Sequence, residues 1–62
     1  MTKVKMTPTG LNGNAFAIMA EFKNKAWAQG WSLGQIDDVI QEASSGDYDH
    51  LLQTIMSNVE YP

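Results

Sequence analysis

The sequence predicts a mainly α-helical, small α+β domain: a bundle of three helices with short, paired strands at the two ends of the chain. Three successive segments show helical amphipathicity, and the junctions between them carry helix-capping residues. The 62 residues suffice for one domain, 1–62, and 44% of them are hydrophobic, which excludes an intrinsically disordered chain. Cysteine is absent from the sequence, so stability must come from packing without disulfides.

Each end of the chain carries a short strand pattern. Thr2 to Thr7 alternates lysine with valine and methionine, as a half-buried strand does, and Pro8 stops it. Val59 to Tyr61 forms a second short segment, ended by Pro62. We expect the two strands to lie side by side, because an isolated strand would leave its backbone groups without partners.

The first helix is expected to begin after a cap at Asn12 or Asn14, run to about Gln29 and end at Gly30. Phe16 and Trp27 lie beside its apolar stripe and make the apolar face unusually wide. The stripe itself follows the spacing i, i+3, i+4, i+7. Its members are Ala15, Ile18, Met19, Phe22 and Ala26.

The second helix, about Leu33 to Ser44, has a strong start signal. Ser32 and Gln35 form a capping box, and Trp31 can pack on Ile36 as a hydrophobic staple.

A glycine joint follows the second helix. Gly46 is expected to adopt the left-handed conformation that ends a helix, and Asp47 to cap the third helix, about Tyr48 to Asn58. The residues that we expect to be buried in the core of the bundle are Val4, Phe16, Met19, Phe22, Ile36, Val39, Ile40, Leu51, Leu52 and Ile55.

Charge and hydropathy exclude two classes of partner. The net charge is −3, arginine is absent, and the third helix has no lysine, which argues against a nucleic-acid surface or a recognition helix. No apolar run approaches the roughly 20 residues of a membrane span, and no signal-peptide core follows the N-terminal lysines. We therefore expect no nucleic acid, no membrane and a cytoplasmic location.

Asp47, Asp49 and His50 form the one cluster that could indicate catalysis or metal binding. A zinc site needs three or four convergent ligands, and the later ligands of a calcium loop are missing. A capped helix start with a solvent-facing histidine explains these residues better. We expect no catalytic residues, no metal and no cofactor, and hence a protein that is not an enzyme.

The glycine-rich loop from Gly10 to Asn14 is the best candidate for a small ligand. It lacks the lysine and serine or threonine of a P-loop, and the GxGxxG spacing is absent. Its backbone N–H groups could still hold an anion where a helix begins. As an alternative function, Gly13 and Asn14 would bind or sequester a nucleotide or another anion together with Asp47 and His50.

A chain of this length can bury only part of its aromatic side chains. We expect Trp27 or Trp31 to keep part of its ring in solvent and, with Phe16, to form a partner-binding surface. Self-association is a further possibility, because the same patch or the edge of a terminal strand could meet another copy.

Two segments carry a resemblance to a known set of proteins. Gly13-Asn14-Ala15-Phe16-Ala17-Ile18 and Ser45-Gly46-Asp47-Tyr48-Asp49-His50-Leu51-Leu52-Gln53-Thr54 resemble segments of short proteins encoded by bacteriophages and prophages. The likeness spans about Val4 to Tyr61, although Gln29-Gly30 matches the family's "AG" turn only at the glycine. It implies an accessory role in the cytoplasm of a bacterial host and supplies no catalytic residues. The leading hypothesis is a non-enzymatic module that binds a host or phage protein.

Overall fold

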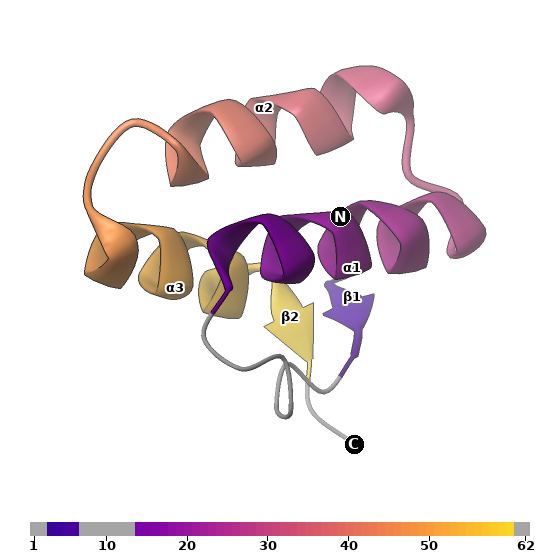
Figure 1. Cartoon of the computed structure of the whole chain (residues 1–62). Coiled ribbons are helices and arrows are strands. Elements are labelled where there is room, and N and C mark those ends of the chain that lie inside the picture. The colour runs from indigo at the N-terminus through magenta and orange to yellow at the C-terminus, as the bar shows by residue number, and fades with distance from the viewer. Residues whose placement is uncertain (1–2, 7–13, 61–62) are drawn as a thin grey trace.

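The computed structural model describes residues 3–6 and 14–60. The elements in chain order are β1 (Val4–Lys5), α1 (Ala15–Ala28), α2 (Leu33–Ala43), α3 (Tyr48–Ser57) and β2 (Val59–Glu60). Figure 1 shows α2 on one side and the strands on the other, with α1 and α3 between them. The predicted three-helix bundle with paired terminal strands is confirmed. In this described part of the chain, no helix is both long and apolar enough to cross a bilayer.

The two strands are parallel, with Val4 opposite Val59 and Lys5 opposite Glu60. The Val4 N–H donates to the Asn58 carbonyl at 2.8 Å. Both valines are buried and their neighbours are exposed, as the alternation predicts. A parallel pair needs a long crossover connection, and here the helical bundle supplies it.

The outer edge of β1 is already paired at Lys5 by a side chain. The Lys5 N–H donates to Gln29 Oε1 at 2.8 Å, and Gln29 Nε2 donates to the Lys5 carbonyl at 2.9 Å. An unpaired strand edge is where another chain can add a strand. Because Gln29 takes both backbone groups of Lys5, addition of a second copy at this point would have to displace it.

The helix starts follow the predicted caps. Of the two caps that the sequence offers for α1, Asn14 is the one observed, because its side-chain oxygen accepts from the backbone N–H groups of Phe16 and Ala17. At α2 both bonds of the capping box between Ser32 and Gln35 are present.

Asp47 caps α3, because its Oδ1 accepts from the His50 N–H at 2.9 Å. Loop residues 7–13 and Tyr61 lie outside the described residues, so the strand ends and the glycine-rich loop expected there stay predictions.

The two glycine joints differ from each other. Gly30 has φ of +96°, as expected for the residue that ends α1. The left-handed conformation predicted for Gly46 is not observed, because α2 ends in a right-handed turn at Ser44. Gly46 is required for space instead, since an added Cβ would lie 2.9 Å from His50 Cβ and Cγ.

Of the ten residues predicted for the core, five are buried and four are partly buried against it. Phe22, Ile36, Ile55 and Val4 are its largest fully buried side chains, and Leu51 joins them. Met19, Val39, Ile40 and Leu52 are partly buried and pack against this core. Further buried residues that the prediction omitted are Met6, Ile18, Ala26, Trp31, Ala43 and Val59.

The prediction that Phe16 is buried is wrong. Its side chain is 80% exposed. The core-facing stripe of α1 runs through Ile18, Phe22 and Ala26. Successive helical residues are rotated by about 100°, so a residue two positions before Ile18 points far away from that stripe.

Two glycine-to-alanine substitutions, one inside α2 and one at the joint before α3, test whether Gly46 is required for space. We expect Gly34→Ala to raise the free energy of unfolding by about 0.5–1 kcal/mol, because nothing lies within 4 Å of an added Cβ inside α2. We expect Gly46→Ala to lower it by about 1–3 kcal/mol, because the methyl group would collide with His50. Urea unfolding followed by circular dichroism measures both values. A Gly46→Ala protein as stable as the wild type would contradict the close packing at this joint.

Candidate functional site

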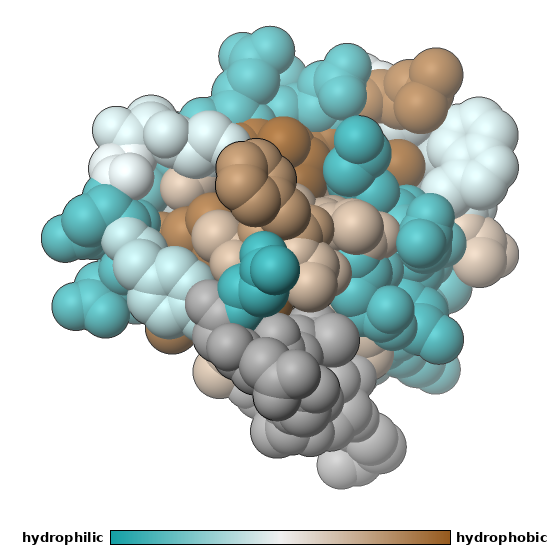
Figure 2. Space-filling view, viewed as in Figure 1, coloured by the Kyte–Doolittle hydropathy of each residue, from teal (hydrophilic) through white to brown (hydrophobic). Residues whose placement is uncertain are grey.

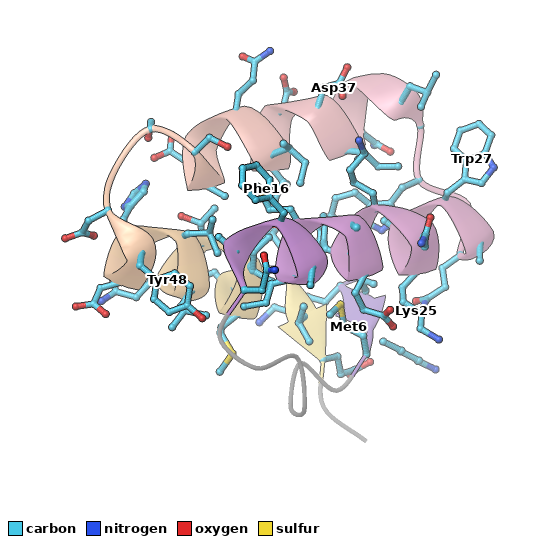
Figure 3. All side chains as sticks on the ribbon, viewed as in Figure 1. Met6, Phe16, Lys25, Trp27, Asp37 and Tyr48 are labelled. Atoms are coloured by element: carbon cyan, nitrogen blue, oxygen red, sulfur yellow. The ribbon has the colours of Figure 1, made fainter. Side chains whose placement is uncertain are left out.

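Helix α1 has a second, exposed side that carries two aromatic rings. Phe16 is 80% exposed and Trp27 is 60% exposed. Eleven positions separate them, which is about three helical turns, so both lie on the same side of α1 about 16 Å apart along its axis. Figure 3 shows both rings pointing away from the strands, Phe16 in front of the space between α1 and α2 and Trp27 at the far end of α1.

Phe16 borders a hollow of about 300 Å³ at the junction of all three helices. The N-terminal turn of α1, the C-terminal end of α2 and the start of α3 form its walls. Its lining residues are Ala15, Phe16, Met19, Ala43, Ser44, Gly46, Asp47, Tyr48 and Leu51. We call it the joint hollow.

Trp27 borders a second hollow, of about 230 Å³, between the C-terminal half of α1 and the N-terminal half of α2. Leu33, which is 64% exposed, lies on its α2 side. Its lining residues are Lys23, Asn24, Trp27, Leu33, Ile36 and Asp37. We call it the Trp27 hollow.

The two hollows lie toward opposite ends of α1, each beside one end of α2. On α1 the lining residues recur from Phe16 through Met19 and Lys23 to Trp27, one helical turn after another. On α2, which runs in the opposite direction, Leu33, Ile36 and Asp37 line the Trp27 hollow and Ala43 and Ser44 line the joint hollow. We call the two hollows, together with the surface of α1 and α2 between them, the α1–α2 groove. Figure 2 shows brown, apolar side chains gathered in the middle of this face, with teal, hydrophilic ones around them.

Trp31, the third residue of the predicted aromatic surface, does not lie in the groove. It is only 8% exposed, and its ring meets the Phe22 ring edge-on with the centroids 5.5 Å apart. Gly30 turns the chain, and the Trp31 N–H donates to the Ala26 carbonyl at 3.0 Å, which directs this residue back over the end of α1. The expectation that Trp27 or Trp31 stays in solvent is therefore confirmed for Trp27, whereas Trp31 is a core residue.

His50 connects α3 to the end of α2 and does not simply face solvent. Its Nε2 lies 2.9 Å from both the carbonyl oxygen and the Oε2 of Glu42. Both oxygens are acceptors, so the imidazole donates from Nε2. Sequence reasoning missed this contact, because nothing in the amphipathic pattern pairs residues across a joint; Gly46, which leaves room for the imidazole, was the available signal.

The residues of the alternative ligand site are placed as follows. Gly13 lies outside the described residues. Asn14 and Asp47 use their side-chain oxygens to cap α1 and α3. The first residues of α1 and α3 border the same joint hollow, so the two helix starts do converge, but an aspartate already lies there.

Metal binding has no support in residues 3–6 and 14–60, because no group of three or more His, Cys, Asp or Glu side chains there could hold an ion. Asp47 and His50 lie next to each other because the Asp47 carboxylate accepts the His50 backbone N–H. Glu42 lies beside them because its carboxylate accepts from the His50 imidazole.

Comparison of the chain with models of protein families, with curated proteins and with solved structures finds no match.

Single-tryptophan proteins test the difference between the two indoles. We expect Trp27 in Trp31→Phe to be quenched by acrylamide much more strongly than Trp31 in Trp27→Phe, because one ring is 60% exposed and the other 8%. Near-equal quenching constants in two folded variants would contradict the placement of Trp27 outside the core.

Proposed function

We propose that this protein is a non-enzymatic protein-interaction module, which binds its partner along the α1–α2 groove with Phe16 and Trp27 as anchors. The observation that carries the proposal is the exposure of these two rings on one side of α1, each beside an apolar hollow. Exposed apolar patches on small proteins mark contact sites, and aromatic anchors dominate the energetics of such contacts.

The energetics of the groove favour a macromolecular contact. Burying a side chain of the size of phenylalanine or leucine is worth roughly 1.5–3 kcal/mol, and Phe16, Trp27 and Leu33 are all largely in water. A partner that covered all three would gain a central apolar contact about 16 Å long.

The joint hollow supports this function better than binding of a nucleotide or another anion. An anion at the start of α3 would meet Asp47, whose carboxylate already accepts the His50 N–H, and Asp49 in the same turn. The remaining lining is mostly apolar. A carboxylate beside an apolar wall suits an apolar or cationic side chain of a partner protein.

The biological setting that we propose rests on the likeness of the segments around Gly13–Ile18 and Ser45–Thr54 to phage and prophage proteins. On that basis the chain is an accessory protein of a phage or prophage, acting in the cytoplasm of its bacterial host. Its partner would be a host or phage protein.

A pull-down with matched variants tests the proposal. Immobilised wild-type protein is compared with Phe16→Gln/Trp27→Gln and with Met56→Gln, which removes an exposed apolar side chain of α3 that lines neither hollow. Glutamine keeps a good helix propensity at each position. We expect proteins captured from bacterial lysate by the wild type and by Met56→Gln to be lost with the double variant. Equal capture by all three proteins would refute the groove as the binding surface.

A further inference from the structure

We infer that the occupant of the α1–α2 groove is a basic amphipathic helix of a partner protein. This inference rests on the proposed function and adds the chemistry of the partner. It follows from the shape of the groove and from the distribution of charge around it.

The shape of the groove fits a helix. Its lining residues on α1 recur every helical turn from one hollow to the other, and its outer anchors, Phe16 and Trp27, are about 16 Å apart. A helix laid between α1 and α2 presents apolar residues at i, i+4, i+7 and i+11, which span the same length. Figure 3 shows Phe16 and Tyr48 toward one end of this path and Trp27 at the other.

An extended strand has no comparable site at Lys5. Both backbone groups of Lys5 are bound to the Gln29 side chain, so that part of the β1 edge is not open for strand addition. The exposed apolar groups of α1 and α2 therefore offer a partner side-chain contacts, which is how an amphipathic helix binds.

Positive and negative residues occupy different parts of the sequence, and this distribution indicates the charge of the partner. All four lysines precede residue 26, whereas residues 33–60 contain no lysine or arginine. The acidic residues in that range are Asp37, Asp38, Glu42, Asp47, Asp49 and Glu60. Helices α2 and α3 thus present negative charge, without lysine or arginine, to a partner that contacts them.

The two ends of the groove differ in charge. The Trp27 hollow is lined by Lys23 on α1 and by Asp37 on α2, one charge of each sign. At the joint hollow the charged lining residue is Asp47, and Asp49 follows in the first turn of α3. Lysine or arginine side chains of the partner therefore belong beside Phe16 and Tyr48, where they meet Asp47. A second copy of this chain brings a net charge of −3, which disfavours it as the occupant.

Synthetic peptides test the inference directly. Three helical peptides of about 15 residues share leucine at the four apolar positions and carry lysine, glutamine or glutamate at all flanking positions. Calorimetry gives each Kd, and two-dimensional NMR of isotope-labelled protein locates the site. We expect the lysine peptide to bind at least about tenfold more tightly than the glutamate peptide, with a gap that shrinks at high salt. The shifted resonances should include Phe16, Lys23 and Trp27.

Two variants test whether the tighter binding of the lysine peptide depends on the joint hollow. Asp47→Asn should reduce the difference in Kd between the lysine and glutamate peptides, and asparagine preserves the cap of α3. Asp38→Asn removes an acid of α2 that lines neither hollow and should leave the gap unchanged.

Three results would overturn the inference. Equal Kd values for the lysine and glutamate peptides would remove the charge argument. Dimerisation through the groove, seen by sedimentation at rising concentration and abolished by Phe16→Gln, would make a second copy the occupant. Failure of every peptide to bind, while capture from lysate still depends on Phe16 and Trp27, would refute a helical occupant and leave the proposed function standing.

Discussion

Helix α1 carries more apolar surface than the other described residues, 3–6, 14 and 29–60, cover, and this uncovered surface determines where a partner can bind. One side of α1 buries Ile18, Phe22 and Ala26 against the other helices and the strands. Phe16 and Trp27 lie on another side, which the short helices α2 and α3 do not cover. A domain of 62 residues buries a smaller share of its surface than a larger one, so it cannot enclose every aromatic ring. The α1–α2 groove is the consequence.

The joints and caps hold this groove in shape with polar contacts. Gly30 reverses the chain so that α2 returns along α1 and Trp31 closes the core. At the other end Gly46 leaves room for His50, whose imidazole holds the last turn of α2 through Glu42. These contacts help to set the positions of α2 and α3 beside α1, and the side chains of Phe16 and Trp27 take no part in them.

Local signals predicted the helices and their caps, because capping depends on residues three or four positions apart. The capping box at Ser32 and the N-cap at Asp47 are of this kind, and both are confirmed. Phe16, Trp31 and Gly46 were predicted less well, because their environments depend on how elements pack. Helical rotation turns Phe16 away from the core, the turn at Gly30 brings Trp31 into it, and only the position of His50 explains Gly46. The joint hollow could not be foreseen, since it brings Phe16 of α1 beside Ser44 and Tyr48, which are distant in the sequence.

The free energy of unfolding of Phe16→Gln/Trp27→Gln tests most directly whether this aromatic surface serves binding and not folding. Urea unfolding of the double variant is compared with that of the wild type and of Phe22→Ala, which truncates a fully buried ring. The double variant should stay within about 0.5 kcal/mol of the wild type, as surface substitutions usually do, whereas Phe22→Ala should lose about 3–5 kcal/mol. A loss above about 2 kcal/mol in the double variant would show that Phe16 and Trp27 belong to the core, and would contradict the account.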